Sequence, residues 1–170
     1  MKEIDVIDAL SKFKPENFVF VISKDNKKAS GMIAAWNMRC SWTPALYAVS
    51  LSKAGYTHKL IQKSKEFVVA VPNKALEETV LFFGSKSGSE VDKFKETKVK
   101  IVSGKKVKVP LLKDATFNFE CKLIQTIDTG DHFTFIGEVV VAHFNEGKGI
   151  LLNYGKKNGK RHFKEMPLEL

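Results

Sequence analysis

Short apolar runs separated by polar turns dominate the first half of the chain. The runs 17–23, 45–51 and 66–72 are rich in β-branched and aromatic residues, and turn-forming residues bound each of them. Such runs are typical of buried strands. The segment 31–36 fits a strand or a helix by pattern alone, but the polar loop and Gly31 before it favour a hairpin with 17–23.

A longer alternating pattern follows in the second half. In the segment 115–127 the side chains of Phe117 and Phe119 alternate with polar ones. The turn sequence DTGD separates this segment from 132–144, which is again rich in β-branched and aromatic residues. This arrangement predicts a long β-hairpin. The apolar run 149–155 predicts one more strand.

Three segments have helical spacing instead. The segment 57–66 has Thr57 as its expected N-cap, 73–84 begins at an asparagine and ends at a glycine, and 89–97 begins at a serine. Strands and helices do not alternate regularly, which disfavours a doubly wound parallel sheet. We therefore expect one domain over residues 1–170, mainly β with flanking helices and built on a closed antiparallel β-barrel.

The chain is strongly basic, with a formal net charge of +9 over 170 residues. Such a charge raises nucleic acid as a partner. Arg39 and Arg161 are the only arginines, however, and the lysines are scattered apart from local groups at 105–108 and 156–161. Arginine is the usual residue for reading bases. A solvated lysine-rich surface is therefore the favoured interpretation, and no nucleic-acid partner is expected.

Signals for membrane insertion, secretion or metal binding are not recognisable in the sequence. No apolar run approaches the roughly 20 residues that span a bilayer. The segment 1–13 carries acids where a signal peptide has an apolar region. We expect a cytoplasmic protein without a membrane partner, in which Cys40 and Cys121 are reduced. The histidines lack metal-ligand spacing, so no metal is expected.

The stretch SLSKAGYTHKL is a candidate phosphate site. Ser52, Lys53, Tyr56 and Thr57 stand where a strand ends and a helix begins. Hydroxyls, an ammonium group and free N–H groups at a helix N-terminus suit a phosphate, although an ordinary N-cap beside a solvated lysine explains the same residues. The glycine- and serine-rich loop 84–90 also suits an anion, but a capped loop between two helices is the commoner explanation.

Four segments, in this order and spacing, resemble one known family. They are NMRCSWTPALYAVSLSKAGYTHKLIQKSKEFVVAVP, SGSEVDKF, FECKLIQTIDTGDHFTFIGEVVVAHF and GILLNYG. The chain resembles the flavin reductase-like proteins with an FMN-binding split barrel, the group that includes flavoredoxins, over most of its length between Phe18 and Tyr154. The resemblance implies an antiparallel, Greek-key-like split β-barrel, FMN as the cofactor, and a homodimer.

The resemblance also implies a set of site residues. In the family, a loop like NMRCSW contacts the isoalloxazine ring, a segment like SLSKAGYTH holds the ribityl phosphate, and a segment like SGSEVDKF completes the site. The matching residues are Asn37, Met38, Arg39, Cys40, Ser41 and Trp42 for the ring, Ser52, Lys53, Tyr56 and Thr57 for the phosphate, and Ser87, Gly88, Asp92 and Lys93. His132, in the turn GDH, matches a His that relatives using a nicotinamide donor place near the flavin. It is a candidate nicotinamide or substrate contact, although a lone His beside a turn is often a surface group.

Three positions depart from the family pattern. Ser89 stands where a basic residue is usual. Cys40 stands where a small hydroxyl residue often precedes Ser-Trp, and a thiol is only a weak hydrogen-bond donor. Arg39 is also unusual, and a cation beside the flavin would favour its anionic reduced form.

Three functions are compatible with these observations. The first is an FMN-dependent oxidoreductase of flavin-reductase type, which passes electrons from NADH or NADPH through bound flavin to a second acceptor. The second is a flavoredoxin-type electron carrier that another redox protein reduces. The third is a basic nucleic-acid-binding barrel. The resemblance favours the first, keeps the second as its alternative, and names no electron acceptor.

Overall fold

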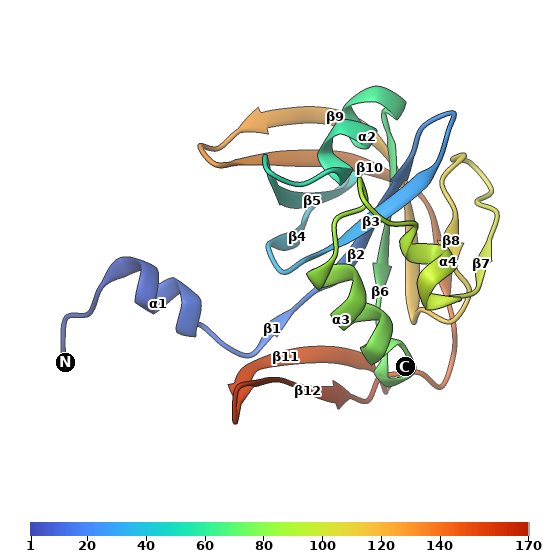
Figure 1. Ribbon diagram of the computed structural model, residues 1–170. Helices are drawn as coiled ribbons and strands as arrows, with labels where there is room; N and C mark the ends of the chain where they lie inside the picture. The colour runs from blue at the N-terminus through green and yellow to red at the C-terminus, as the bar shows by residue number, and fades with distance from the viewer. Residues whose placement is uncertain (170) are drawn as a thin grey trace.

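The apolar runs form a seven-stranded antiparallel sheet in the computed structural model, which describes residues 1–169 (Figure 1). In spatial order its strands are β3 (Ala29–Ala34), β2 (Val19–Lys24), β6 (Glu66–Val71), β9 (Phe117–Asp128), β10 (His132–Phe144), β5 (Ala45–Ser52) and β4 (Asn37–Trp42). The sheet curls into an antiparallel barrel, in which the backbone N–H of Ser50 in β5 donates to the carbonyl of Trp36, just after β3, at 2.8 Å.

The barrel is split rather than closed. Within residues 1–169 no strand ladder pairs β3 with β5. The physical reason is that β5 uses one edge for β10 and the other for β4, so neither edge is left for a full ladder with β3. The closed barrel expected from the apolar pattern is therefore wrong, and the antiparallel split barrel implied by the family resemblance is confirmed.

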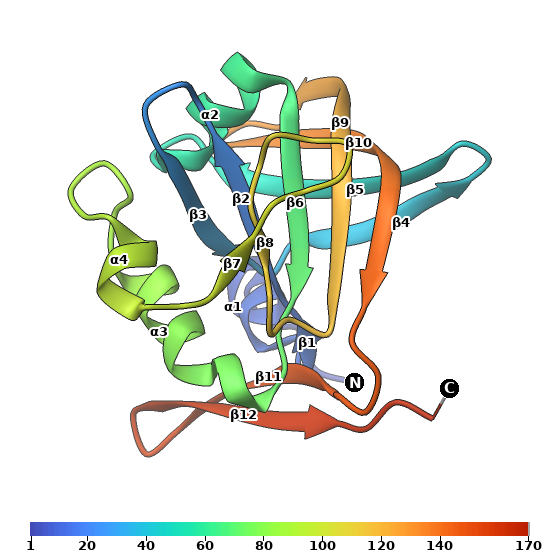
Figure 2. The same cartoon turned by 90° about the vertical axis from the view of Figure 1, so that its right-hand side faces the viewer.

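Two smaller sheets and the helices surround this barrel (Figure 2). β1 (Glu16–Asn17), β11 (Ile150–Lys157) and β12 (Lys160–Met166) form a three-stranded sheet, and β7 (Ile101–Val102) pairs with β8 (Leu111–Leu112). The helices are α1 (Val6–Lys12), α2 (Thr57–Ser64), the 3-10 helix η1 (Lys74–Leu76), α3 (Glu77–Ser85) and α4 (Lys93–Thr97). α3 and α4 lie on one flank of the barrel, whereas α1 stands away from it (Figure 1).

Both faces of β2 are buried, which explains its unbroken apolar run. Val19 and Val21 belong to the core inside the barrel. Phe20 and Ile22 point to the opposite face and pack in a second core beneath α3. There the rings of Phe20 and Phe83 are arranged edge to face, with centroids 5.2 Å apart. A strand covered on both faces is continuously apolar rather than alternating. The two cores together fix the position of β3, the edge strand beside β2.

The strands expected from the apolar runs and the long hairpin of β9 and β10 are confirmed. The alternation in that hairpin is interrupted by register shifts in β10, one of them between Ile136 and Gly137. A Cβ added at Gly137 would stand 2.5 Å from the ring of Phe67. The glycine therefore allows this ring to pack against the backbone of β10.

Several local expectations are wrong. The segment 37–42, expected as a loop, is the edge strand β4, because its backbone pairs with β5. Trp36, the last residue of the strand expected over 31–36, has 58% of its surface exposed because β3 ends two residues earlier. Tyr56 is the N-cap of α2, and Thr57 is the first helical residue. α1 and β12 are additional elements that the pattern does not predict.

A buried carboxylate holds the basic loop 103–108 against the barrel. Glu120 of β9 is fully buried, and its two oxygens accept hydrogen bonds of 2.6 to 2.9 Å from three main-chain N–H groups of this loop. The Nε2 atom of His143 lies 2.7 Å from the same carboxylate. Burial alone raises the pKa of Glu120, but these bonds together outweigh it and lower the pKa to about 2.

Replacement of this carboxylate should cost stability in a pH-dependent way. Because the pKa of Glu120 is depressed in the folded state, its contribution is present above the ordinary carboxyl pKa and is lost as the pH falls toward 2. We expect Glu120→Gln to lower the free energy of unfolding by about 3 kcal/mol at neutral pH. Urea denaturation should show the difference from wild type shrinking below about pH 4.5. The exposed Glu146→Gln variant is the control, and an equal, constant difference for both variants would contradict the account.

Candidate functional site

A hollow opens where β5 passes into α2 and faces the end of α3. We call it the α2 hollow, and its volume is about 320 Å³. Its lining comes from β3, the β5–α2 turn and the end of α3 with the loop that follows, and consists of Met32, Ile33, Ala54, Gly55, Tyr56, Thr57, Phe83, Gly84, Ser85, Lys86, Ser87, Gly88 and Lys93. Of the sequence-predicted residues, Tyr56, Thr57, Ser87, Gly88 and Lys93 are therefore brought together here.

The α2 hollow ends at an uncapped helix start. α2 has eight residues, and no side chain makes a cap hydrogen bond at Tyr56, its N-cap. The first N–H groups of a helix have no partner within the helix and carry partial positive charge. Thr57, the first helical residue, lines the same hollow. Free N–H groups, a hydroxyl and the helix dipole thus face one small space, which is the arrangement that binds a phosphate.

Two buried polar atoms near the start of α2 have no hydrogen-bond partner among the described residues. They are Oγ of Ser30 and Nδ1 of His58. A Cβ added at Gly88, which lines the hollow, would lie 1.9 Å from the Ser30 oxygen, so the two residues are in close contact. His58 lies in the first turn of α2, but its ring packs against that of Phe133 with centroids 5.7 Å apart, and it does not line the hollow. Because buried polar groups are nearly always satisfied, the Ser30 oxygen beside this cavity supports a ligand site.

The loop after α3 is held in place by lysine and aspartate side chains. The Nζ atom of Lys28 donates to the Gly88 carbonyl at 2.5 Å and lies 5.0 Å from the Tyr56 ring centroid. Asp92 accepts hydrogen bonds from two main-chain N–H groups and so caps α4. Lys93 is buried, and its Nζ donates to the carbonyls of Gly31 (2.9 Å) and Phe83 (2.7 Å). Burial lowers the pKa of Lys93 to about 8.

Asp92 and Lys93, two of the residues that the resemblance implies for the site, both make hydrogen bonds within the chain. Asp92 does not line the α2 hollow, and its side chain is used to start α4. Lys93 lines the hollow, but its ammonium group donates two of its three hydrogen bonds to main-chain carbonyls. Both side chains therefore fix the loop that carries Ser87 and Gly88.

Ser52 and Lys53 lie at the end of β5, next to the lining of the α2 hollow. The Ser52 Oγ accepts a hydrogen bond from the Ala54 N–H at 3.3 Å. The Nζ atom of Lys53 bonds both oxygens of Asp128, at 2.7 and 2.8 Å, and lies 4.7 Å from the Phe133 ring. This ion pair lowers the pKa of Asp128. The ammonium group of Lys53 is thus paired with Asp128 at the β9–β10 turn. To bind an anion, Lys53 has to share this ion pair or break it.

His132, the first residue of β10, lies against the exposed side chain of Trp36. The ring centroids of His132 and Trp36 are 4.7 Å apart, and Nδ1 of His132 is 2.6 Å from Oδ1 of Asp131. His132 pairs with Ser52 in the β10–β5 ladder. An aromatic surface with an imidazole therefore stands beside the β5–α2 turn. Trp36 is a functional candidate that the sequence analysis placed only at the end of an expected strand, and the polar residues that follow it were the available signal.

The residues of β4 line a different hollow. This second hollow, which we call the β4 hollow, has a volume of about 700 Å³ and is mostly apolar. Its lining contains Asn37, Met38, Arg39 and Trp42 and shares no residue with the α2 hollow. Cys40 and Ser41 line neither. The residues expected at the flavin ring and those expected at its phosphate therefore line separate hollows, and the ring contact of residues 37–42 stays a prediction.

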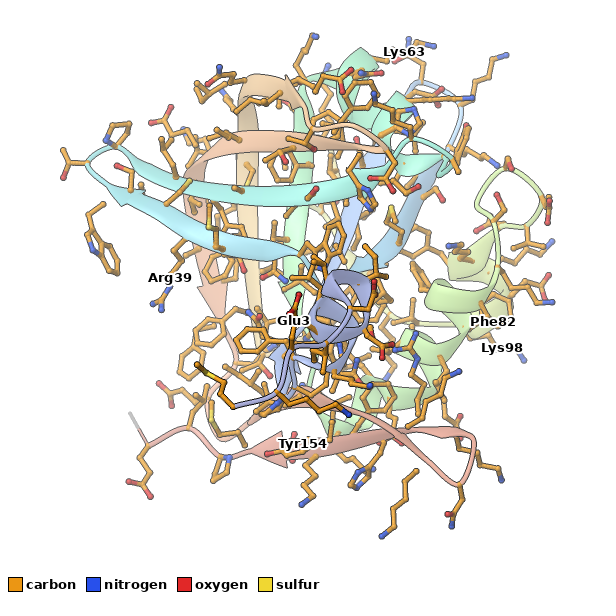
Figure 3. All side chains as sticks on the ribbon, turned by 90° about the vertical axis from the view of Figure 1, so that its left-hand side faces the viewer. Glu3, Arg39, Lys63, Phe82, Lys98 and Tyr154 are labelled. Carbon is orange, nitrogen blue, oxygen red and sulfur yellow. The ribbon has the colours of Figure 1, made fainter. Side chains whose placement is uncertain are left out.

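Side-chain contacts explain why these β4 residues do not reach the α2 hollow. The amide group of Asn37 is used within the chain: its Nδ2 donates to the carbonyls of Ala34 and Ala35, both at 3.1 Å, and its Oδ1 accepts from the Tyr47 hydroxyl at 2.6 Å. The Arg39 guanidinium lies 5.9 Å from the exposed Trp42 ring. Figure 3 shows Arg39 on the face from which α1 projects.

Membrane and metal features add no further candidate within the described part of the chain. No helix there is long and apolar enough to cross a membrane. Residues 1–169 also contain no group of three or more His, Cys, Asp or Glu side chains suited to a metal ion. Both cysteines are free, with Cys40 exposed and Cys121 buried.

Comparison with known proteins assigns the family. The model of the flavin reductase like domain matches residues 13–160. The chain therefore belongs to the flavin reductase-like family. A relative, an uncharacterized protein of Archaeoglobus fulgidus, is 36% identical over 148 residues, which are 85% of this chain and 83% of the relative.

Solved structures agree with the split barrel. The FMN-binding protein of Thermus thermophilus, solved with bound p-hydroxybenzaldehyde, is 28% identical with a TM-score of 0.83 and covers 96% of this chain and 94% of that one. Flavoredoxin of Desulfovibrio vulgaris is 26% identical with a TM-score of 0.83 and covers 100% and 96% of the two chains. A flavin is thus the ligand class that the family and fold share.

The close contact of Gly88 with Ser30 can be tested by a double-mutant cycle. A methyl group at residue 88 overlaps the Ser30 oxygen, so we expect Gly88→Ala to lower the free energy of unfolding by about 1–3 kcal/mol. Ser30→Ala removes an unpartnered oxygen and should be nearly neutral. The double variant should recover much of the loss, because the 3.1 Å contact with the Ser30 Cβ remains but the overlap is gone. Strictly additive losses in urea denaturation would argue against this packing.

Proposed function

We propose that the protein binds FMN with its phosphate in the α2 hollow and works as an FMN-dependent oxidoreductase of flavin-reductase type. The observation that carries this proposal is the uncapped start of α2, which opens into a hollow whose residue Gly88 touches the buried, unpartnered Oγ of Ser30. Family membership supports a flavin, and the FMN-binding Thermus thermophilus relative supports FMN among flavins.

The donor groups present fit a phosphate. The N–H groups of the first turn of α2 supply donors together with the dipole. The hydroxyl of Thr57 and the serine-rich loop at Ser87 add neutral donors, and Lys28 and Lys53 bring positive charge to the rim. A phosphate bound there would be held mainly by short, charge-assisted hydrogen bonds.

The flavin ring is assigned to the aromatic surface next to this hollow. Trp36 and His132 lie together at the start of β10 and flank the β5–α2 turn, so a ligand with its phosphate at Thr57 extends toward them along the edge strand β3. Bound FMN would supply the redox chemistry, taking electrons from a donor and delivering them to an acceptor. The chain's own part is to orient the ring and to present His132, held by Asp131, to the donor.

A flavoredoxin-type carrier is the second candidate function. The likeness to flavoredoxin of Desulfovibrio vulgaris favours it. The net charge of +9 also suits the transient docking of an acidic redox protein, because complementary charge accelerates encounter. The two functions differ in the electron donor, which is a nicotinamide for the first and a redox protein for the second.

We also propose that the protein is a homodimer joined through its N-terminal arm, residues 1–13. α1 has no buried residue, and Val6, Ile7 and Leu10 are all more than 60% exposed. The side chains of the arm sum to −1, whereas those of the other residues sum to +10. An apolar, slightly acidic arm is therefore complementary to the basic body of a second copy, and the apolar β4 hollow lies on the face from which α1 projects (Figure 3).

Phosphate recognition is tested by comparing FMN with riboflavin, which lacks the phosphate. Thr57→Val should weaken FMN binding about 10-fold or more, because a hydrogen bond to a charged group is lost, and should leave riboflavin binding unchanged. Fluorescence titration with each flavin measures both affinities, and the exposed Thr126→Val variant is the matched control. Equal loss for both flavins, or wild-type protein that binds riboflavin as tightly as FMN, would contradict the proposed phosphate site.

The arm contact predicts a specific loss of dimer. Leu10→Lys should weaken self-association at least 10-fold, since a buried leucine contributes about 1.5–3 kcal/mol. Ser11→Lys adds the same charge to the same helix at a residue that is already polar and should have little effect. Sedimentation equilibrium measures the dissociation constants. A monomeric wild-type protein, or equal effects of the two variants, would refute the arm-mediated dimer.

A further inference from the structure

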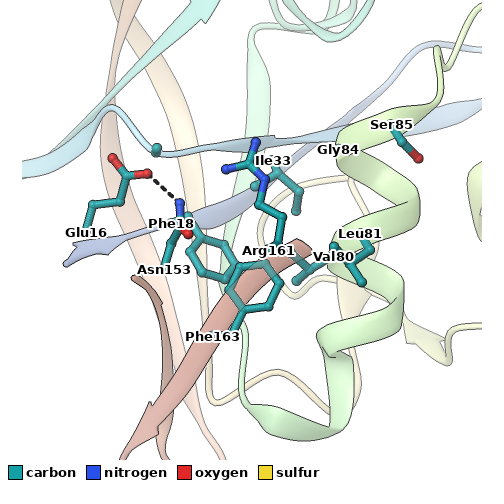
Figure 4. A pocket seen from close by; sticks show the side chains of 11 residues that line it. Glu16, Phe18, Ile33, Val80, Leu81, Gly84, Ser85, Asn153, Arg161 and Phe163 are labelled. Carbon is teal, nitrogen blue, oxygen red and sulfur yellow. Dashed lines mark hydrogen bonds between the residues drawn. The ribbon is translucent and has the colours of Figure 1, made fainter. Parts of the chain in front are cut away.

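A third hollow lies between α3, β3 and the β11–β12 hairpin, and nothing above assigns it a ligand (Figure 4). We call it the α3 hollow, and its volume is about 350 Å³. Its walls are mostly apolar, from Phe18, Ile33, Ala35, Val80, Leu81 and Phe163, with the polar groups of Glu16, Ser85, Asn153 and Arg161 around them. The size is at the lower end of what small-molecule sites use, so the hollow suits one ring system.

The α3 hollow adjoins the α2 hollow. Ile33, Gly84 and Ser85 line both of them. Both hollows therefore follow β3 on one side and the end of α3 on the other. A molecule bound in the α3 hollow would be the immediate neighbour of a flavin held as proposed above.

The apolar wall is suited to a flat ring. Phe18 and Phe163 form a tilted pair with ring centroids 5.2 Å apart, and Figure 4 shows both rings along the same side of the hollow. Nucleic acid bases stack readily on such aromatic side chains. Val80 and Leu81 of α3 complete the apolar surface from the facing helix.

The polar end carries a free positive charge. The Arg161 guanidinium makes no hydrogen bond or ion pair with another residue in the part of the chain that the structure describes, and it extends over the hollow beside Ile33 (Figure 4). The one acid in the lining is Glu16. Its carboxylate forms an ion pair with the Nζ atom of Lys14 at 2.5 Å and accepts a hydrogen bond from the Nδ2 atom of Asn153 at 2.7 Å. An anion at Arg161 thus meets little opposing charge.

The same hairpin is strongly basic around Arg161. Lys156, Lys157, Lys160 and Lys164 accompany it on β11 and β12, and the exposed Lys164 lies over the Tyr154 ring at 4.8 Å. A singly charged carboxylate would use only part of this field. A phosphate monoester has two charges and three acceptor oxygens, and it pairs with guanidinium in the bidentate manner that arginine favours.

We propose that the α3 hollow binds the adenosine 2′-phosphate end of NADPH, with the purine against Phe163 and the 2′-phosphate on Arg161. The chain would then take NADPH in preference to NADH. This inference rests on the proposed function, because it specifies the nicotinamide donor that would reduce the neighbouring flavin. The binding step itself needs no flavin and is testable alone.

The test uses 2′,5′-ADP and 5′-AMP, which differ in the 2′-phosphate, titrated calorimetrically into the full-length FMN-loaded protein. We expect 2′,5′-ADP to bind at least 10-fold more tightly than 5′-AMP, and Arg161→Gln to remove that difference while leaving FMN affinity unchanged. Arg161→Lys should keep part of it. Arg39→Gln, which removes the chain's other arginine and does not alter the lining of the α3 hollow, should retain it.

Two results would overturn the inference. One is equal affinity of the wild-type protein for both nucleotides, and the other is discrimination that persists in Arg161→Gln. Either result, obtained with protein that folds and binds FMN normally, rejects the α3 hollow as a 2′-phosphate site and leaves the flavin proposal unaffected. Failure of the wild-type protein to bind FMN rejects the proposed function instead. In steady-state kinetics, the KM for NADPH should rise in Arg161→Gln while kcat and the KM for NADH stay constant.

Discussion

The antiparallel pairing of β10 with β5 is the constraint on which the candidate site depends. It sets His132 opposite Ser52, and the Lys53 N–H donates to the Asp131 carbonyl at 3.0 Å. The end of β5 is therefore fixed at the β9–β10 turn, and α2 begins a few residues later, where Tyr56 and Thr57 line the α2 hollow. The bond from Ser50 to Trp36 then brings the end of β3 to the same place. A one-residue slip in this register would turn these side chains to the opposite face.

Polar side-chain contacts fix the positions of segments around the site that strand pairing alone does not determine. Glu120 ties the basic loop 103–108 to β9, Lys93 joins β3 to α3 through two carbonyls, and Asn37 fixes the turn from β3 into β4. Each of these groups is costly to bury without partners. All three side chains could equally serve chemistry when seen only as sequence. In the fold their hydrogen-bonding capacity is spent largely on the backbone.

That distinction limits what the sequence could predict. Strands buried on both faces, such as β2, and the β9–β10 hairpin were predictable because burial imposes the apolar pattern directly. The gathering of Tyr56 and Thr57 at one hollow was predictable because the polar residues of a helix start are local in sequence. The split into α2 and β4 hollows was not, since it depends on long-range pairing of β4 with β5. Trp36 and the exposed apolar face of α1 resemble core by composition, and only burial shows that they are on the surface.

The central claim is that this barrel holds FMN so that a nicotinamide can reduce it. The most direct measurement is an anaerobic spectral titration of the FMN-loaded protein with NADPH and with NADH. The account predicts that the flavin absorbance bleaches with a nicotinamide donor at one equivalent per flavin. A protein that stays yellow with both nucleotides, yet is bleached by dithionite, would contradict the reductase assignment and leave the carrier function in its place.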